Sequence, residues 1–429
     1  MSERTFGFET IALHGGQEVD PTTTSRAVPI YRTSSYVFKD TTHAANLFAL
    51  KEMGYIYTRI MNPTHDVLEQ RMAQLEGGAA ALALASGTSA SFYSIINICS
   101  AGDEVVSASN LYGGTYTMFD QILPQFGINV KLVDYSNPDA FEAAINENTR
   151  VIFAETIGNP KLQVVDLEVI AKVAQKHHLP FVVDSTFTPP CLLKPLDHGV
   201  DIVVHSLTKW IGGHGTGIGG IVVDGGKFDW TDPKFKLFNE PEPSYGGLRF
   251  AHDLGDLNPV CFALRMRLVP LRNLGACISP DNAWIFIQGL ETLALRMERH
   301  CENTVKVVDY LSQHPKVSWV CYPGLKSEPS YPVAEKYLKK GFGSVVAFGV
   351  KAGREAAEKF INSLELFSQL ANVGDAKSLA LHPASTTHSQ LSDEQLDEVG
   401  ITPEFIRLSV GIESIDDIIW DIEQSLSKI

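Results

Sequence analysis

Cysteine is scarce in this chain and is not arranged to form a site. The six cysteines among 429 residues are scattered and include no C-x-x-C pair, so we expect reduced core residues and neither a disulfide framework nor a zinc site. Basic residues are also in the minority, with 35 Lys and Arg against 50 Asp and Glu and a net charge of −15. An acidic surface argues against nucleic-acid and anionic-membrane partners and fits a protein that acts on small molecules.

Long apolar runs and nucleotide-binding motifs are missing too. No uninterrupted apolar run approaches the length of a membrane span, and Met1-Ser-Glu-Arg-Thr5 has no apolar signal core, so a cytoplasmic location is expected. The pattern G-x-x-x-x-G-K-[ST] is absent. The glycine-rich run 212–220 precedes a strand instead of opening a helix, so it is not a dinucleotide fingerprint.

What is present favours an α/β protein with two domains and an arm. Residues 1–60 are polar and irregular, which predicts an extended arm that packs on another subunit. In residues 61–290, helical stretches alternate with short apolar segments, which predicts a mostly parallel sheet covered on both faces. The segments expected as strands are 104–108, 130–133, 151–154, 181–184, 202–205 and 220–223.

The C-terminal half is expected to contain two further parts. Residues 225–290 are rich in aromatic residues, Pro and Gly and predict a long excursion from the large domain. One helix, residues 284–311, should lead into a smaller α+β domain at 291–429. Within that domain, the alternating pattern around Arg407 is compatible with an exposed charge on an edge strand, which is the alternative to a functional role.

A lysine ends one of the buried strands. Lys209 follows the apolar residues 202–204 and the polar corner Ser206-Leu-Thr208. Burial there would lower its pKa, and a neutral amine is a nucleophile that can form a Schiff base. The alternative is a strand-end lysine that points into water.

An aspartate ends the preceding strand. Because the carboxyl ends of parallel strands meet at one edge of a sheet, Asp184 is expected near Lys209. A carboxylate opposite a lysine Schiff base is typical of pyridoxal phosphate (PLP) chemistry, although Asp184 could also be a simple turn cap. Ser86-Gly-Thr88 opens a helix and could bind an anion with backbone N–H groups, or be an ordinary N-cap.

Taken together, these motifs resemble the Cys/Met-metabolism family of PLP-dependent enzymes of fold type I. The motifs are Ser86-Gly-Thr88, Tyr112-Gly-Gly114, Glu155-Thr-Ile-Gly-Asn159-Pro160, Val183-Asp184-Ser-Thr-Phe187, Ser206-Leu-Thr-Lys209 and Arg407-Leu-Ser-Val-Gly411. The resemblance covers essentially the whole chain. It implies a large domain with a mostly parallel seven-stranded sheet flanked by helices, a smaller α+β C-terminal domain and an extended N-terminal arm.

The resemblance also implies a role for each matching residue. Lys209 would hold PLP as a Schiff base and move protons, with Asp184 on the ring nitrogen and Tyr112 stacked on the ring. The phosphate would be bound by Gly87, Thr88, Ser206 and Thr208, and by Tyr57 and Arg59 of a neighbouring subunit, which implies a homo-oligomer, usually a dimer of dimers. Asn159 would lie near the ring hydroxyl, and Arg407 with Ser378 would bind the substrate carboxylate. His205 and His214 are given no catalytic role.

One position separates the members of the family. Lys377 stands where cystathionine synthases and lyases typically carry Glu, and the run 372–384, followed by Ser385-Thr-Thr-His-Ser389, is similar to O-acetylhomoserine sulfhydrylases. The expected reaction is γ-replacement of O-acetyl-L-homoserine by sulfide, giving L-homocysteine and acetate in methionine biosynthesis. An O-succinylhomoserine sulfhydrylase, a methionine γ-lyase and a non-catalytic PLP-binding regulator remain alternatives. Thr88 departs from the methionine of many relatives but keeps the backbone N–H.

Overall fold

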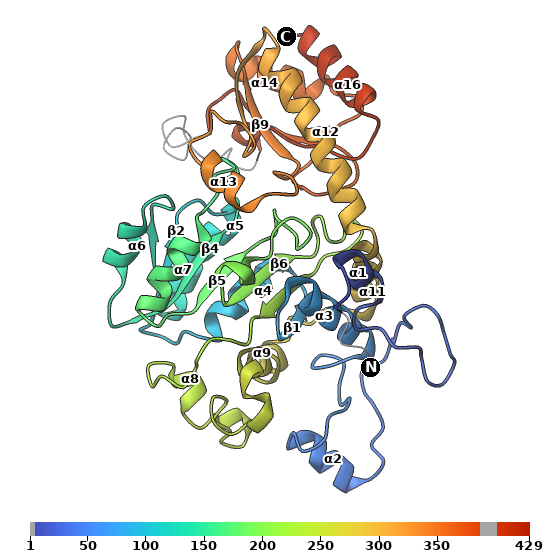
Figure 1. Ribbon diagram of the computed structural model, residues 1–429, viewed down its shortest axis with the longest axis vertical. Coiled ribbons are helices and arrows are strands. Elements are labelled where there is room, and N and C mark those ends of the chain that lie inside the picture. The colour runs from blue at the N-terminus through green and yellow to red at the C-terminus, as the bar shows by residue number, and fades with distance from the viewer. Residues whose placement is uncertain (1–4, 387–400) are drawn as a thin grey trace.

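The computed structural model describes residues 5–386 and 401–429 and contains two β-sheets, one above the other in Figure 1. Of the run quoted above, residues 387–389 lie outside the described residues. Within the described ranges, no helix combines the length and the hydropathy that crossing a membrane requires.

The larger sheet has seven strands and confirms the expected α/β architecture. Its order is β1-β7-β6-β5-β4-β2-β3, and only β7 runs antiparallel to its neighbours. All six predicted segments are strands. The bounds are β1 (Ala80–Leu84), β2 (Glu104–Ala108), β3 (Asn129–Val133), β4 (Thr149–Glu155), β5 (Phe181–Asp184), β6 (Ile202–Ser206) and β7 (Gly220–Asp224).

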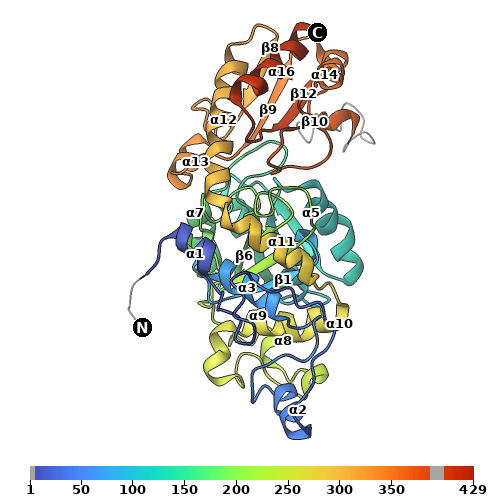
Figure 2. The ribbon, with the colours of Figure 1, turned by 90° about the vertical axis from the view of Figure 1, so that its right-hand side faces the viewer.

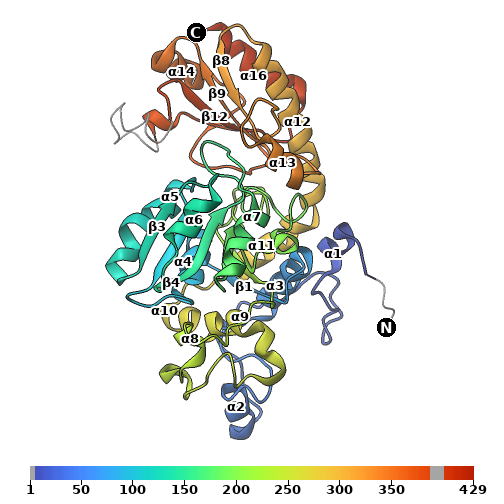
Figure 3. The same ribbon diagram turned by 60° about the vertical axis from the view of Figure 1, so that its left-hand side comes forward.

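Both faces of this sheet are buried because alternate residues of each strand enter two separate cores. Val183 and Val203 belong to the core that includes α3 (Pro63–Glu76) and α7 (Leu167–Lys176). Val182, Ile202 and Val204 belong to the opposite core, with α4 (Gly87–Ile96), α9 (Cys261–Met266) and the turn after α5 (Gly113–Thr117). Figure 3 shows α6 (Pro138–Ala144) beside α7, on the same face of the sheet. Strands buried on both faces read as continuous apolar runs, which is why they were predictable.

The excursion and the arm are more helical than their composition suggests. Residues 225–290 include α8 (Lys236–Asn239), α9, α10 (Arg272–Leu274) and α11 (Pro280–Glu291), and the arm includes α1 (Phe8–His14) and α2 (Thr41–Phe48). The single helix predicted at 284–311 is wrong. Thr292 leaves helical geometry, with φ −116° and ψ 8°, and separates α11 from α12 (Leu293–Gln313).

The smaller sheet has five strands in the order β10-β11-β12-β9-β8. Figure 2 shows that α12 begins near the larger sheet and runs upward alongside the smaller sheet. The remaining elements are β8 (Val317–Cys321), α13 (Tyr331–Tyr337), β9 (Val345–Val350), α14 (Gly353–Asn362), β10 (Ser368–Gln369), β11 (Leu379–Leu381), β12 (Phe405–Ser409) and α16 (Ile415–Ser427). Arg407 lies on β12, an interior strand between β11 and β9. The reading of Arg407 as an exposed edge-strand charge is therefore wrong.

One buried carboxylate ties α16 to the loop after α14. Asp421 accepts hydrogen bonds from the backbone N–H groups of Glu365 (2.8 Å), Leu366 (2.9 Å) and Phe367 (2.9 Å). Asp421 is fully buried and the Phe367 N–H is buried with it, so this donor has no access to water if the carboxylate is removed.

We therefore expect Asp421→Ala to lower the free energy of unfolding of the smaller sheet's domain by about 3 kcal/mol, because backbone N–H groups, one of them buried, lose a charged acceptor. Urea unfolding followed by tryptophan fluorescence measures the change. Asp417→Ala, an exposed residue on the same helix, is the control and should cost about 1 kcal/mol or less. Equal effects of the two substitutions would contradict this account.

Candidate active site

The turn that carries Lys209 is fixed by buried polar contacts. Directly after β6, the Lys209 N–H donates to the Ser206 carbonyl at 3.2 Å. Arg296 of α12 donates to the carbonyls of Trp210 (2.6 Å) and Ile211 (3.2 Å). Sequence reasoning missed Arg296, because a charged residue on a long helix gives no sign that it is buried. The turn therefore has a fixed backbone from which the lysine extends.

The Lys209 amine is held by an amide from the other sheet's domain. Burial, and secondly the positive charge of Arg407, lower the pKa of Lys209 from an ordinary 10.5 to about 8. Its Nζ donates to Asn372 Oδ1 at 2.5 Å. Gly374 permits this approach, because a Cβ there would come within 2.6 Å of the Trp210 nitrogen, and its φ is +80°. Asn372 begins the run 372–384, and no local pattern there predicts this contact with Lys209.

A buried carboxyl group, Glu155, and a half-buried one, Asp184, lie side by side at the carboxyl ends of β4 and β5. Glu155 and Asp184 are paired in register, as expected of neighbouring parallel strands. Burial raises the pKa of both, and for Glu155 the charge of Asp184 raises it further. Glu155 Oε1 accepts from the Tyr112 N–H at 2.9 Å and so holds the start of α5. A cation facing Asp184 would stabilise its ionised form, and a protonated ring nitrogen is such a cation.

The N-terminus of α4 meets the end of β6. The Ser86 hydroxyl accepts from the Ser89 N–H at 3.0 Å, while the first-turn N–H groups of a helix have no partner within it. A Cβ on Gly87 would come within 2.6 Å of the Ser206 Cβ, so only glycine allows this contact. The Gly219 N–H donates a hydrogen bond to the Thr208 hydroxyl at 3.1 Å. The arrangement leaves an anion-binding helix end beside Ser206.

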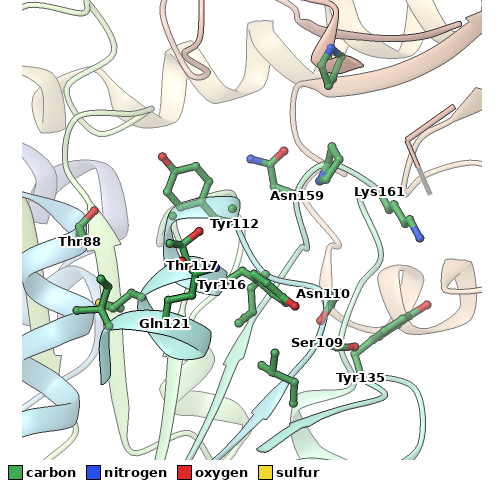
Figure 4. A pocket seen from close by; sticks show the side chains of 18 of the residues that line it. Thr88, Ser109, Asn110, Tyr112, Tyr116, Thr117, Gln121, Tyr135, Asn159 and Lys161 are labelled. Carbon is green, nitrogen blue, oxygen red and sulfur yellow. The ribbon is translucent and has the colours of Figure 1, made fainter. Parts of the chain in front are cut away.

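A large cleft of about 1470 Å³ opens beside these groups. Its lining includes Ser86, Thr88, Tyr112, Asn159 and Arg407, several of which are labelled in Figure 4. Arg407 donates to Asn159 Oδ1 at 2.9 Å and to the Asn372 carbonyl at 3.3 Å. Burial lowers the pKa of Arg407 to about 10.

Lys209, Asp184, Ser206 and Thr208 are not themselves among the residues that line this cleft. Lys209 is connected to it through Asn372 and Arg407. Asp184 is connected through Glu155, which holds Tyr112. Contacts of Asn372 and Glu155 therefore link Lys209 and Asp184 to residues that line the cleft.

Three expected residues lie apart from the cleft. The Ser378 hydroxyl donates to Glu413 Oε2 at 2.9 Å and accepts from the Gly411 N–H at 2.9 Å, so its partners lie within its own domain. Tyr57 and Arg59 line a second pocket of about 530 Å³, and the Arg59 guanidinium lies over the Tyr57 ring at 5.3 Å. Neither residue lines the large cleft, and both side chains are exposed.

Both histidines near Lys209 have other partners. His205 is fully buried and pairs with Glu76 at 2.5 Å, on the face of the sheet that packs on α3. His214 Nδ1 is bonded to the Gly212 carbonyl at 2.8 Å. Neither is given a catalytic role.

Known proteins resemble this chain over nearly its whole length. The model of the family described as Cys/Met metabolism PLP-dependent enzyme matches residues 9–427. The chain belongs to this family. It is 57% identical to an O-acetyl-L-homoserine sulfhydrylase from Leptospira meyeri, over 99% of this chain and 98% of the relative. It is 53% identical to a homocysteine synthase from Schizosaccharomyces pombe, over 98% of each.

A solved structure shares the fold closely. It is of an O-acetylhomoserine (thiol)-lyase from Campylobacter jejuni, with a TM-score of 0.94, 43% identity, and coverage of 98% of this chain and 100% of that one. It contains N'-pyridoxyl-lysine-5'-monophosphate. Like its family, this chain is a PLP-dependent enzyme, and the residues present fit the cofactor. Lys209 offers an amine of lowered pKa, Asp184 a half-buried carboxyl without a cationic partner among the described residues, and Gly87 a helix end beside Ser206.

The lowered pKa of Lys209 can be tested directly. In the PLP-free protein, we expect the acylation rate of Lys209 to rise with a midpoint near pH 8. Arg407→Gln should move this midpoint upward, because it removes the positive charge that disfavours the ammonium form. Peptide mass spectrometry after brief labelling gives the rate at each pH, with exposed Lys326 as internal standard. An unchanged midpoint in the variant would show that Arg407 does not act on this amine.

Proposed function

We propose that this enzyme catalyses γ-replacement of O-acetyl-L-homoserine by sulfide, giving L-homocysteine and acetate in methionine biosynthesis. One observation supports it most: Asn372 contacts both Lys209 and Arg407, so a base and a carboxylate-binding group are fixed relative to each other. The choice of the acetyl ester rests on the names of the most similar relatives given above.

The cofactor would be held by residues at or after the ends of four strands and at the start of one helix. Lys209 would bind its aldehyde, Asp184 its ring nitrogen, and Tyr112 one face of its ring. The helix end at Gly87 and Thr88, with Ser206 and Thr208, would bind its phosphate. Asn159 would lie near the ring hydroxyl. Bound PLP supplies an electron sink that stabilises negative charge at the substrate α-carbon.

The chain's own groups account for the remaining steps. Arg407 binds the substrate carboxylate with a planar guanidinium, and Asn159 and Asn372 hold that guanidinium in place. Ser378, directly before β11, supports this site because its hydroxyl accepts from the Gly411 N–H, just after the strand β12 that carries Arg407. Lys209, once free, takes the α-proton and then moves a proton at the β-carbon, for which an amine with a pKa of about 8 is suited. The C–O bond at the γ-carbon breaks with acetate leaving, and hydrosulfide forms the C–S bond there.

We further propose a shared site between subunits, with the arm at 1–60 contributing Tyr57 and Arg59 to the phosphate of the partner's cofactor. Their position in a pocket of their own, away from the large cleft, supports this arrangement. The division into residues 61–290 and 291–429, a dimer of dimers and a cytoplasmic location are part of the same proposal. The described cysteines are all free thiols, which suits a reducing compartment.

Substitution of the lysine and a choice of ester test the reaction. Lys209→Ala should lose covalent PLP attachment, seen as loss of the visible absorbance that survives gel filtration, and should lower kcat by about 10³-fold or more. The wild-type enzyme should use O-acetyl-L-homoserine with a higher kcat/KM than O-succinyl-L-homoserine, each with sulfide. Faster turnover of the succinyl ester would reassign the substrate, and 2-oxobutyrate as the main product would indicate elimination instead.

Mixing of two inactive variants tests the shared site. Lys209→Ala and Arg59→Ala subunits should each be impaired alone. After denaturation and joint refolding at equal amounts, about a quarter of wild-type activity should return, because half of the dimers are mixed and each has one intact site. Activity no greater than that of the two variants measured separately would place Arg59 in its own subunit's site.

A further inference from the structure

The large cleft carries charge of the opposite sign to the rest of the protein. Among its described lining residues, Lys161 and Arg407 are basic and Asp134 is the only acidic one. The chain as a whole has a net charge of −15. Asp134 Oδ1 is already hydrogen-bonded by the N–H (2.9 Å) and hydroxyl (2.8 Å) of Ser136. A cleft of net positive charge in an acidic protein attracts small anions.

The Arg407 guanidinium has hydrogen-bond partners, whereas the Lys161 ammonium has none among residues 5–386 and 401–429. The described residues place no carboxylate within salt-bridge distance of the Lys161 ammonium. Figure 4 shows its side chain at the opposite end of the cleft from Thr88, the same end as Tyr135. Within the part of the chain that the structure describes, no side chain neutralises this charge.

The backbone of Lys161 is fixed on both sides. It lies in a closed loop after β4, in which the Gly158 N–H donates to the Gln163 carbonyl at 2.9 Å and the Leu162 N–H donates to the Gly158 carbonyl at 3.0 Å. The thiol of Cys321 on β8 donates to the Lys161 carbonyl at 3.2 Å. A cation on a rigid loop is preorganised for binding, because little backbone entropy is lost.

A second unpartnered polar group lies in the same cleft. Asn110 Oδ1 is buried without a hydrogen-bond partner among the described residues, while its Nδ2 donates to the Gln163 carbonyl at 3.4 Å. A buried acceptor without a donor is uncommon in proteins and is satisfied when a ligand or water donates to it. Lys161 thus offers a positive charge to an anion at this part of the cleft, called here the outer cleft, whereas Asn110 Oδ1 can accept only from an S–H, N–H or O–H group such as the S–H of hydrosulfide.

We propose that the outer cleft binds the sulfur nucleophile of the replacement reaction, which Lys161 recognises as an anion. The ligand class is a thiolate, either hydrosulfide or a small thiol that carries a carboxylate. Asn159, two residues before Lys161 on the same loop, contacts Arg407, so one loop places the nucleophile's site beside that of the amino-acid carboxylate. The thiolate forms the C–S bond at the γ-carbon as acetate leaves with the C–O bonding pair. This inference rests on the proposed function.

Three nucleophiles and three variants test it in the PLP-loaded enzyme. The nucleophiles are hydrosulfide, 3-mercaptopropionate, which carries a carboxylate, and 2-mercaptoethanol, which is neutral. Lys161→Gln should raise the KM of the carboxylate-bearing thiol about five- to tenfold and that of the neutral thiol less than twofold. Lys161→Arg should retain near wild-type values, and Lys326→Gln, at an exposed lysine outside the cleft, is the matched control.

A binding measurement separates this inference from the proposed function. Calorimetric titration with 3-(methylsulfanyl)propionate, which has no free thiol, should show a Kd about five- to tenfold weaker in Lys161→Gln than in wild type. A raised KM for the carboxylate thiol alone assigns carboxylate recognition, and a raised KM for hydrosulfide as well assigns recognition of the anion itself. Equal changes for all three nucleophiles with an unchanged Kd overturn the inference. Failure of the wild type to turn over the ester with any nucleophile overturns the proposed function, while the titration still tests the site.

Discussion

The active site depends on one amide that joins two sheets. Asn372, from the loop before β11, accepts a hydrogen bond from Lys209 through its side chain and from Arg407 through its backbone. Lys209 belongs to the larger sheet's domain and Arg407 to the smaller one. Burial, and secondly the positive charge of Arg407, lower the pKa of Lys209 to about 8, so this amine responds near neutral pH. Lys209 and Arg407 are thus fixed in one network.

Other contacts across the same boundary keep that network in register. Trp210, next to Lys209, donates from its indole nitrogen to the Ser344 hydroxyl at 2.7 Å. The Ala376 N–H donates to the Gly213 carbonyl at 2.8 Å. These groups are buried or half-buried, and a buried polar group that loses its partner is costly. The smaller domain is therefore held against the Lys209 turn by hydrogen bonds as well as by apolar packing.

Much of the fold followed from local sequence. Strands buried on both faces, such as β5 and β6, are continuous apolar runs, and the Asn62-Pro63 start of α3 is a recognisable cap. The break at Thr292 was not predictable, because the residues around it continue a helical pattern and only tertiary contacts, such as those of Arg296, separate α11 from α12. The chain segments beyond the sheet, rich in Pro and aromatic residues, formed short helices whose ends depend on packing.

The sequence predicted the positions of site residues that follow a strand. It did not predict the residues whose place in the site depends on contacts with distant parts of the chain. Asp184 and Lys209 follow strands, so their convergence followed from the topology. Asn372 and Glu155 act on residues 163 and 43 positions away, and no local pattern records such pairings. Ser378 shows the reverse case, since its motif suggested a ligand but Glu413 takes its hydroxyl.

The loop after β4 has a consequence for how this scaffold can diversify. It presents Asn159 toward Arg407 and Lys161 toward the outer cleft, while its own backbone closure depends on neither side chain. Under the role proposed for Lys161, a change at position 161 alters which second reactant is admitted and leaves the contact of Asn159 with Arg407 in place. Recognition of the second reactant and of the cofactor then belongs to separate stretches of the chain.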